Sequence, residues 1–120
     1  MGLIRMNSKN EKYIKYNQVP YNVRNKIDSL IHALNEHNIT VKHAILFGSY
    51  AQGTSTKWSD IDLAIVSDEF VGSRFDDRKK IRPIYLSISP DLEILPYRPE
   101  DFTVDDPFVK EIIETGIPLI

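Results

Sequence analysis

Two short apolar segments rich in β-branched residues, joined by a polar stretch that opens with Gly-Ser, constrain the fold most strongly. Residues 41–47 and 60–66 read as β-strands. Residues 49–53 leave room for one short helical turn between them, and residues 54–59 read as a loop. Strand side chains alternate between two faces, so one face of the second strand is predicted to be apolar. That face would carry Ile61, Leu63 and Ile65.

Helical periodicity appears before the first strand. Apolar residues at helical spacing predict a helix over about residues 20–37. His37-Asn38 is a plausible end, because Asn tolerates the left-handed conformation that closes many helices. The residues that define the spacing are Val23, Ile27, Leu30, Ile31 and Leu34.

Three further elements are predicted in the second half of the chain. Ser73 is a candidate cap for a helix that begins at Arg74, and Pro83 is expected to kink or split that helix. A third strand is predicted at 92–97. The remaining features are a last helix that begins at Asp106-Pro107 and ends at Gly116, and an apolar tail, 117–120, that adds either an edge strand or a contact surface.

The order of these elements predicts an α/β (α+β) fold. It would be a small mixed β-sheet of three to four strands with helices packed on it. Residues 20–120 are predicted to form the domain, and residues 1–19 a polar N-terminal arm. The candidates for docking this arm onto the domain are Tyr13, Ile14 and Tyr16.

Composition excludes several classes of function. The chain has 120 residues, enough for one domain. A net charge of −2 means that any polyanion must be held locally rather than by the whole surface. The absence of cysteine excludes disulfides and thiolate metal sites. There is no signal-peptide pattern and no apolar run long enough to span a membrane, so a cytoplasmic protein is expected.

Two aspartates at the start of the second strand are the strongest candidates for chemistry. Asp60 and Asp62 are two residues apart, so their side chains are expected on the same face of the strand. Neighbouring carboxylates repel each other unless a hard cation lies between them. Mg²⁺ prefers one or two carboxylates together with water and substrate phosphates. An ordinary polar strand end is the alternative interpretation of the pair alone.

Gly48-Ser49 follows the first strand and is a candidate phosphate-binding turn. Glycine allows close approach of a ligand, and a strand that leads into a short helix presents free N–H groups. A plain turn is the alternative for this dipeptide alone. The segment 48–55 almost fits the P-loop pattern, but Thr54 stands where the lysine is needed. The residues after Gly53 are also too few for the long helix of a P-loop, so we reject that interpretation.

Together these residues form Gly-Ser, ten residues, and then Asp-x-Asp, between two apolar strands. This motif resembles the signature of the DNA polymerase beta-like nucleotidyltransferase superfamily, and it is most similar to the minimal nucleotidyltransferases of prokaryotes. The resemblance covers the motif closely and the order of elements from about residue 22 to 116 more loosely.

The resemblance implies roles for individual residues. Gly48 and Ser49 would bind the phosphates of a nucleoside triphosphate, expected to be ATP, and Lys57 is a further candidate for the triphosphate. Asp60 and Asp62 would hold two Mg²⁺ ions. These ions would activate an acceptor hydroxyl and stabilise an in-line displacement that releases pyrophosphate.

The family uses a third carboxylate from the next core strand. Two candidates there are two residues apart, so both are expected on the same face of the strand. Glu93 lies inside the predicted strand between Leu92 and Ile94, whereas Asp91 follows Pro90 at its start. We favour Glu93 as a catalytic residue and metal ligand. Many family members have Asp at this position, so the match is weakest here.

Other polar and aromatic residues have weaker claims. Trp58 is a candidate for stacking on a base or a partner, and packing over the sheet edge is the alternative. Solvation is the alternative for Lys57. A basic stretch is interpreted as a solvated helix face; it contains Arg74, Arg78, Lys79, Lys80 and Arg82.

The acceptor is expected to be another protein. The chain ends soon after its third core strand, so acceptor recognition would come from a short surface, a second copy or another protein. The resemblance implies the antitoxin half of a toxin–antitoxin pair whose partner is a helical ribonuclease of the HEPN type. Two alternatives stay open: a transferase that acts on a small molecule or an RNA end, and a non-catalytic module that neutralises its partner by contact.

Overall fold

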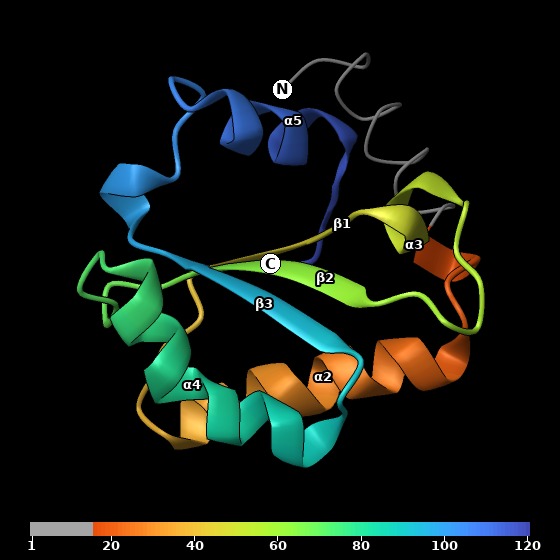
Figure 1. The fold of residues 1–120 in the computed structure, drawn as a ribbon, viewed down its shortest axis with the longest axis horizontal. Helices are drawn as coiled ribbons and strands as arrows, with labels where there is room; N and C mark the ends of the chain where they lie inside the picture. The colour runs from red at the N-terminus through yellow and green to blue at the C-terminus, as the bar shows by residue number, and fades with distance from the viewer. Residues whose placement is uncertain (1–15) are drawn as a thin grey trace.

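The computed structural model describes residues 16–120, in which helices cover both faces of one small sheet (Figure 1). This arrangement confirms the predicted fold class. Its larger elements are α2 (Tyr21–Glu36), β1 (His43–Phe47), β2 (Ile61–Val66), α4 (Arg74–Ile88), β3 (Leu92–Tyr97) and α5 (Pro107–Thr115). Its short elements are α3 (Ser49–Gln52), the 3₁₀ turn η1 (Pro99–Asp101) and β4 (Ile117–Pro118).

The sheet is mixed, with the strand order β3-β2-β1-β4. Strand β1 is antiparallel to β2 and to β4, whereas β2 and β3 are parallel. One row of paired residues crosses three strands: Phe47 lies opposite Asp62, and Asp62 lies beside Glu93. Residues in such a row lie on one face of the sheet, about 5 Å apart from strand to strand. This row places the candidate site.

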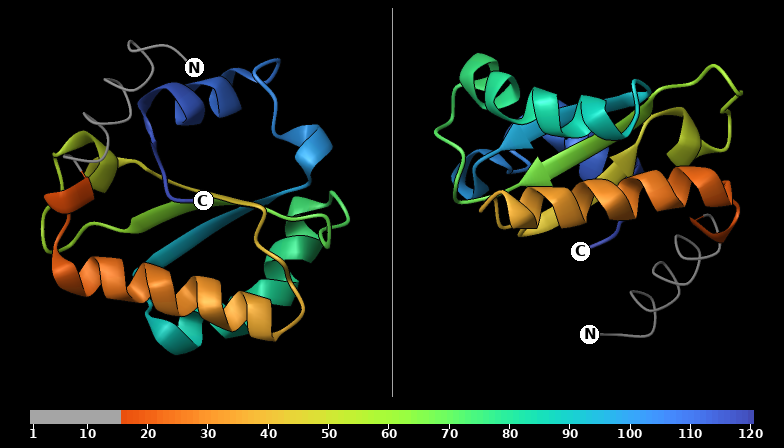
Figure 2. Two further views of the ribbon diagram at one scale, coloured as in Figure 1. Left: turned by 180° about the vertical axis from the view of Figure 1, so that it is seen from behind. Right: turned by 90° about the horizontal axis from the view of Figure 1, so that it is seen from below.

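Each face of the sheet has its own apolar core. Helices α2 and α4 cover the first face, where Leu30 and Leu34 of α2 pack with Ile61 and Leu63 of β2. Helix α5 lies on the opposite side, as Figure 1 and the left view of Figure 2 show. It packs on the second face through Val109 and Ile112, against Ile45, Ala64 and Val66. The Phe47–Asp62–Glu93 row belongs to this second face.

The predicted helix ends are confirmed at several positions. Asn38 follows α2 with a φ of 64°, the left-handed conformation predicted for the end of that helix. The Ser73 side chain accepts a hydrogen bond from the N–H of Asp76 and caps α4. Asp106 caps α5 in the same way, through the N–H groups of Phe108 and Val109.

Helix α4 departs from prediction, because Pro83 does not split it. The helix runs without interruption from Arg74 to Ile88. Proline removes one backbone donor and crowds the carbonyl four residues earlier. Both Pro83 and Lys79, which provides that carbonyl, are exposed, so water can satisfy the carbonyl.

Strand β1 starts two residues later than predicted, at His43 rather than Val41. The partner strand β2 ends at Val66, which pairs with His43, so β1 has no further residue of β2 to pair with. The apolar tail forms the predicted edge strand, since Ile117 pairs with Leu46 of β1.

The beginning of the chain is described from residue 16 onward. Tyr16 packs against the first core, and Val19 is buried within it. Tyr13 and Ile14 lie outside the described residues, and the division of the chain at residue 19 stays a prediction. Within residues 16–120, no helix is both long and apolar enough to cross a membrane.

Candidate active site

Gly48 forms the turn between β1 and α3, and its conformation excludes a side chain. Its φ is 75°, in the left-handed region that glycine adopts easily. A Cβ atom at this position would overlap Oδ2 of Asp62. The glycine therefore does two things: it reverses the chain into α3 and it leaves room for the Asp62 carboxylate beside the turn.

Ser49 begins α3 directly after this turn. The carbonyl of Gly48 accepts hydrogen bonds from the N–H groups of Ala51 and Gln52. The N–H groups of Ser49 and Tyr50 precede the first intrahelical bond and have no partner within the helix. The candidate phosphate-binding turn thus lies immediately beside Asp62, as the motif predicts.

Asp62 is half-buried in β2, and its pKa is raised from 3.8 to about 6. Burial is the largest cause, followed by repulsion from Asp60 and then from Glu93. Asp60 is exposed and lies just before β2, which begins at Ile61, one residue later than the predicted strand 60–66. The structure therefore brings all three carboxylates within mutual electrostatic influence.

The two candidates for the third carboxylate lie in different surroundings. Glu93 is beside Asp62 in the neighbouring strand, and its Oε1 accepts a hydrogen bond of 2.7 Å from Nη2 of Arg78. Asp91 lies before β3 and forms an ion pair of 3.2 Å with Lys26 of α2, on the other side of the sheet. Its carbonyl also accepts the N–H of Ile61. Asp91 is therefore tied to the α2 side, and Glu93 faces the same side as Asp62.

Arg78 is a residue at this site that sequence analysis missed. The basic stretch was interpreted as a solvated helix face, and this holds for Lys79, Lys80 and Arg82, which are exposed. Arg78 instead lies on the covered side of α4, where its side chain is only 26% exposed. A signal was present: Ile81 and Tyr85 follow it at helical spacing and are both buried.

Lys57 and Trp58 lie on the loop between α3 and β2. Trp58 is 83% exposed, so the alternative in which it packs over the sheet edge is wrong. Nζ of Lys57 lies 5.0 Å from the centre of the Trp58 ring. Lys57 also lines a pocket of about 350 Å³ together with Lys26, Tyr50 and Asp91. This pocket adjoins the candidate phosphate-binding turn through Tyr50.

The donor set fits a hard divalent cation that is shared with a substrate. Within residues 16–120, no group of three or more His, Asp or Glu side chains is gathered as a complete metal site. Asp60 and Asp62 nevertheless offer the one or two carboxylates that Mg²⁺ needs when phosphates supply other ligands. Burial is the largest cause of the raised pKa of Asp62, and a bound cation would offset the further contribution that comes from repulsion by Asp60 and Glu93.

Comparison with known proteins agrees with this geometry. The profile of the nucleotidyltransferase domain family matches residues 27–120, so the chain belongs to that family. The match confirms the prediction of a nucleotidyltransferase, a transferase enzyme, from the Gly-Ser and Asp-x-Asp motif. The chain is also 45% identical over 42 residues to the "Putative protein adenylyltransferase" of Methanocaldococcus jannaschii. That alignment spans 35% of this chain and 29% of the relative's length.

Proposed function

We propose that this domain transfers AMP from ATP to a hydroxyl group of a partner protein, in a reaction that depends on Mg²⁺. One observation carries the proposal: the Asp62 carboxylate lies against the Gly48 turn on one side and beside Glu93 on the other. A phosphate-binding turn, metal-binding carboxylates and a candidate base thus follow one another across a single face of the sheet.

Each residue has a role in the proposed reaction. The turn at Gly48 and Ser49 holds the β- and γ-phosphates, with Lys57 as a further contact. Asp60 and Asp62 would hold Mg²⁺, which would supply charge neutralisation at the phosphates and a lowered pKa of the acceptor hydroxyl. Glu93, as a third ligand and base, accepts the hydroxyl proton.

A bond forms between the acceptor oxygen and the α-phosphorus, and the bond from that phosphorus to the bridging oxygen breaks. Pyrophosphate leaves with that oxygen, and the acceptor's proton passes to the Glu93 carboxylate. The hydrogen bond from Arg78 orients Glu93 for this task.

The choice of AMP and of a protein acceptor is supported by the name of the Methanocaldococcus jannaschii relative, "Putative protein adenylyltransferase". The similarity to minimal nucleotidyltransferases supports a narrower proposal, in which the acceptor is a helical HEPN-type ribonuclease toxin and this protein is its antitoxin. AMP added beside a ribonuclease site places negative charge where the RNA backbone must bind.

Intact-mass measurement on the partner tests the proposal. The protein is incubated with MgATP and a HEPN-type ribonuclease as the candidate partner. The expected result is a gain of one or more AMP units on the partner, and no gain with the Asp60→Asn/Asp62→Asn variant. Inhibition of the partner without a mass change, equally strong with the double variant, would contradict transfer and favour neutralisation by contact.

A transferase that acts on a small molecule or an RNA end is the second candidate. It predicts turnover of ATP on such an acceptor without any partner protein. The same incubation with radiolabelled ATP and total RNA in place of the ribonuclease separates the two. Label on RNA alone would contradict the proposed protein acceptor.

A further inference from the structure

The order of residues across the sheet defines the direction from which the acceptor arrives. Displacement at phosphorus is in line, so the acceptor and the leaving pyrophosphate lie on opposite sides of the α-phosphorus. Gly48 lies on the β1 side of Asp62, and Glu93 lies on the β3 side. If the turn at Gly48 holds the leaving phosphates, the acceptor must approach over β3.

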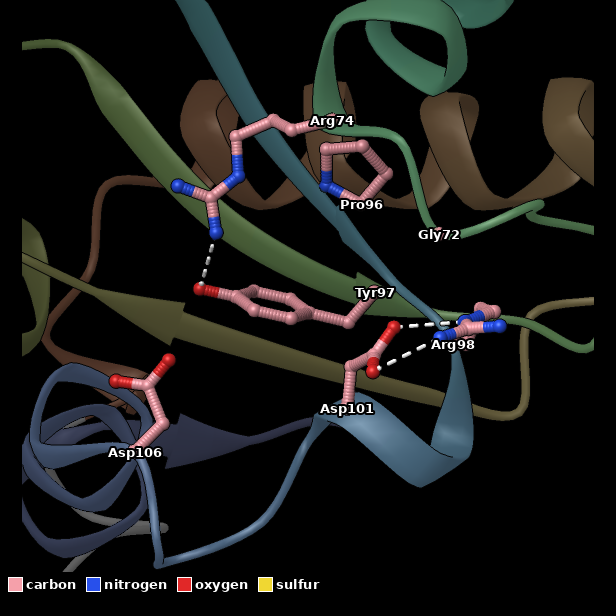
Figure 3. A pocket seen from close by; sticks show the side chains of 7 residues that line it. All are labelled: Gly72, Arg74, Pro96, Tyr97, Arg98, Asp101 and Asp106. Carbon is pink, nitrogen blue, oxygen red and sulfur yellow. Dashed lines mark hydrogen bonds and ion pairs between the residues drawn. The ribbon is translucent and has the colours of Figure 1, made fainter.

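A polar pocket lies over the end of β3 on this same face. It has a volume of about 400 Å³. Tyr97 has the same parity as Glu93, and the two Cα atoms are about 13 Å apart along the strand. Figure 3 shows the pocket with its lining residues, which are Gly72, Arg74, Pro96, Tyr97, Arg98, Asp101 and Asp106.

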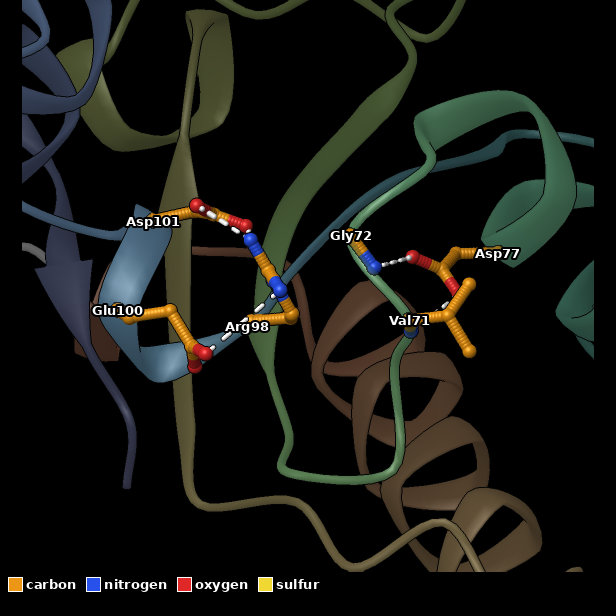
Figure 4. Close-up of polar contacts among 6 residues, drawn as sticks. All are labelled: Val71, Gly72, Asp77, Arg98, Glu100 and Asp101. Carbon is orange, nitrogen blue, oxygen red and sulfur yellow. Dashed lines mark hydrogen bonds and ion pairs between the residues drawn. The ribbon is translucent and has the colours of Figure 1, made fainter.

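One corner of the pocket is a structural ion-pair network (Figure 4). Arg98 binds Asp101 through Nε and Nη2, at 2.7 and 3.1 Å, and its Nη1 lies 3.6 Å from Glu100. A Cβ atom on Gly72, whose φ is 95°, would overlap the Arg98 guanidinium. The Asp77 carboxylate holds the Gly72 loop by accepting the N–H groups of Val71 and Gly72. The charge of Arg98 is therefore already balanced.

Arg74 is different, because in residues 16–120 it takes part in no ion pair. Its Nη2 donates a hydrogen bond of 3.1 Å to the hydroxyl of Tyr97, and its Cζ lies 5.2 Å from the centre of the Tyr97 ring. A guanidinium has five N–H donors, so most of them remain available to a ligand. Tyr97 is buried and fixes the direction of the guanidinium. Arg74 and Arg78 lie one helical turn apart on α4, and Arg78 contacts Glu93.

We propose that this pocket binds the acceptor polypeptide beside the modified hydroxyl, with Arg74 holding an acidic side chain of the acceptor. This inference rests on the proposed transfer to a protein hydroxyl. A carboxylate suits Arg74 because the planar guanidinium can bind it through two parallel hydrogen bonds. An extended chain rises about 3.3 Å per residue, so the acidic residue lies roughly four residues from the modified one.

Short synthetic peptides provide the test. The probes are acetyl-Asp-Gly-Ser-Gly-Tyr-amide, the reverse order Tyr-Gly-Ser-Gly-Asp, and the same two peptides with Asn in place of Asp. AMP transfer from MgATP is measured with the wild type and with Arg74→Gln, Arg74→Lys and Arg82→Gln. Arg82 is exposed and lies two turns further along α4, so Arg82→Gln removes the same charge away from the pocket.

One Asp peptide is expected to have a KM about fivefold or more below that of its Asn counterpart with the wild type. Arg74→Gln should remove this preference, Arg74→Lys should retain part of it, and Arg82→Gln should retain all of it. An equal effect of Arg74→Gln on Asp and Asn peptides would overturn the proposal.

Binding gives a second readout that does not depend on turnover. Backbone amide resonances are recorded while the Asp peptides are added to the wild type. Shifts confined to residues 71–74 and 96–98 support the pocket, whereas shifts only elsewhere or none at all overturn it. Absence of transfer to peptides and to any partner would contradict the proposed function instead, and the resonance shifts would still decide whether the pocket binds the peptide.

Discussion

Arg78 donates a 2.7 Å hydrogen bond from Nη2 to Oε1 of Glu93, and this ion pair reaches from α4 to the face of the sheet that carries Asp62. Arg78 places a positive charge beside carboxylates that repel one another. Asp60 and Glu93 both contribute to the raised pKa of Asp62. The Nε atom of Arg78 is buried without a hydrogen-bond partner, so burial limits the other conformations open to this side chain.

Replacing Arg78 should therefore affect catalysis more than folding. With Arg78→Met we expect kcat to fall about tenfold or more, because Glu93 loses the group that orients it. The KM for ATP should change little, and stability should fall by about 1 kcal/mol or less, because the pair is partly exposed. Steady-state kinetics and thermal unfolding measure both quantities. Arg78→Lys should recover part of the kcat; equal kcat in the wild type and Arg78→Met would exclude the orienting role.

Glu93 and Asp91 can be separated by matched amide substitutions. Glu93→Gln should reduce transfer about 100-fold or more, because the third carboxylate and candidate base is lost. Asp91→Asn should stay within a few-fold of the wild type, because it only weakens a surface ion pair with Lys26. Single-turnover transfer with saturating MgATP measures both. An inactive Asp91→Asn together with an active Glu93→Gln would assign the third carboxylate to Asp91.

Gly48→Ala should damage both the fold and the site. A non-glycine residue at a φ of 75° is strained by about 1 kcal/mol or more, and the added Cβ would also displace the Asp62 carboxylate. We expect a lower melting temperature and no detectable calorimetric heat with MgATP. Gly53→Ala is the matched control, since Gly53 has a φ of 76° but nothing within 4 Å of an added Cβ. If Gly53→Ala weakened MgATP binding as much, backbone strain rather than overlap with Asp62 would explain the loss.

Asp62→Asn should make the protein more stable at neutral pH. The pKa of Asp62 is raised to about 6 in the folded state, so between about pH 4 and 6 the folded state holds a proton that the unfolded state releases. The contribution of Asp62 to the free energy of unfolding therefore falls as the pH rises through that range. Above it, the charged carboxylate is unfavourable in the folded state. The amide removes this charge.

Thermal unfolding across pH measures the effect. At pH 7.5 we expect Asp62→Asn to gain about 1 kcal/mol, or roughly 4 °C in melting temperature, with little gain near pH 4. The matched control Asp105→Asn changes an exposed aspartate outside the site and should leave the profile unchanged. A destabilised Asp62→Asn at pH 7.5 would show that the Asp62 carboxylate contributes favourable interactions that outweigh its repulsion.

Local signals explain why most elements were predictable from sequence. Helix α2 and the strands follow apolar periodicity, and the caps at Ser73 and Asp106 follow from side chains that accept backbone N–H groups. The adjacency of Gly48 and Asp62 was predictable from the motif. The predicted split at Pro83 is wrong because the effect of the proline depends on whether water reaches the Lys79 carbonyl, which is a property of the packed structure.

The roles of Arg74 and Arg78 could not be read from the basic stretch. Whether an arginine in that stretch is solvated depends on which side of α4 faces β3. Helical spacing to the buried Ile81 and Tyr85 indicates that Arg78 lies on the covered side of α4, but its contact with Glu93 depends on the edge position of β3 in the sheet. Likewise, Asp91 and Glu93 are two residues apart and could not be distinguished by sequence, whereas in the structure Asp91 contacts Lys26 and Glu93 lies beside Asp62.

The row that aligns Phe47, Asp62 and Glu93 is held by different interactions from those that place Arg74. Its spacing is maintained by backbone pairing in the middle of the sheet, which does not depend on the identity of the exposed side chains. Arg74 lies instead at the start of a helix, on a surface where substitutions leave those strand pairings intact. With the roles proposed above, a substitution at Arg74 would change acceptor preference and leave the phosphate chemistry intact, because the two would be encoded in separate parts of the fold.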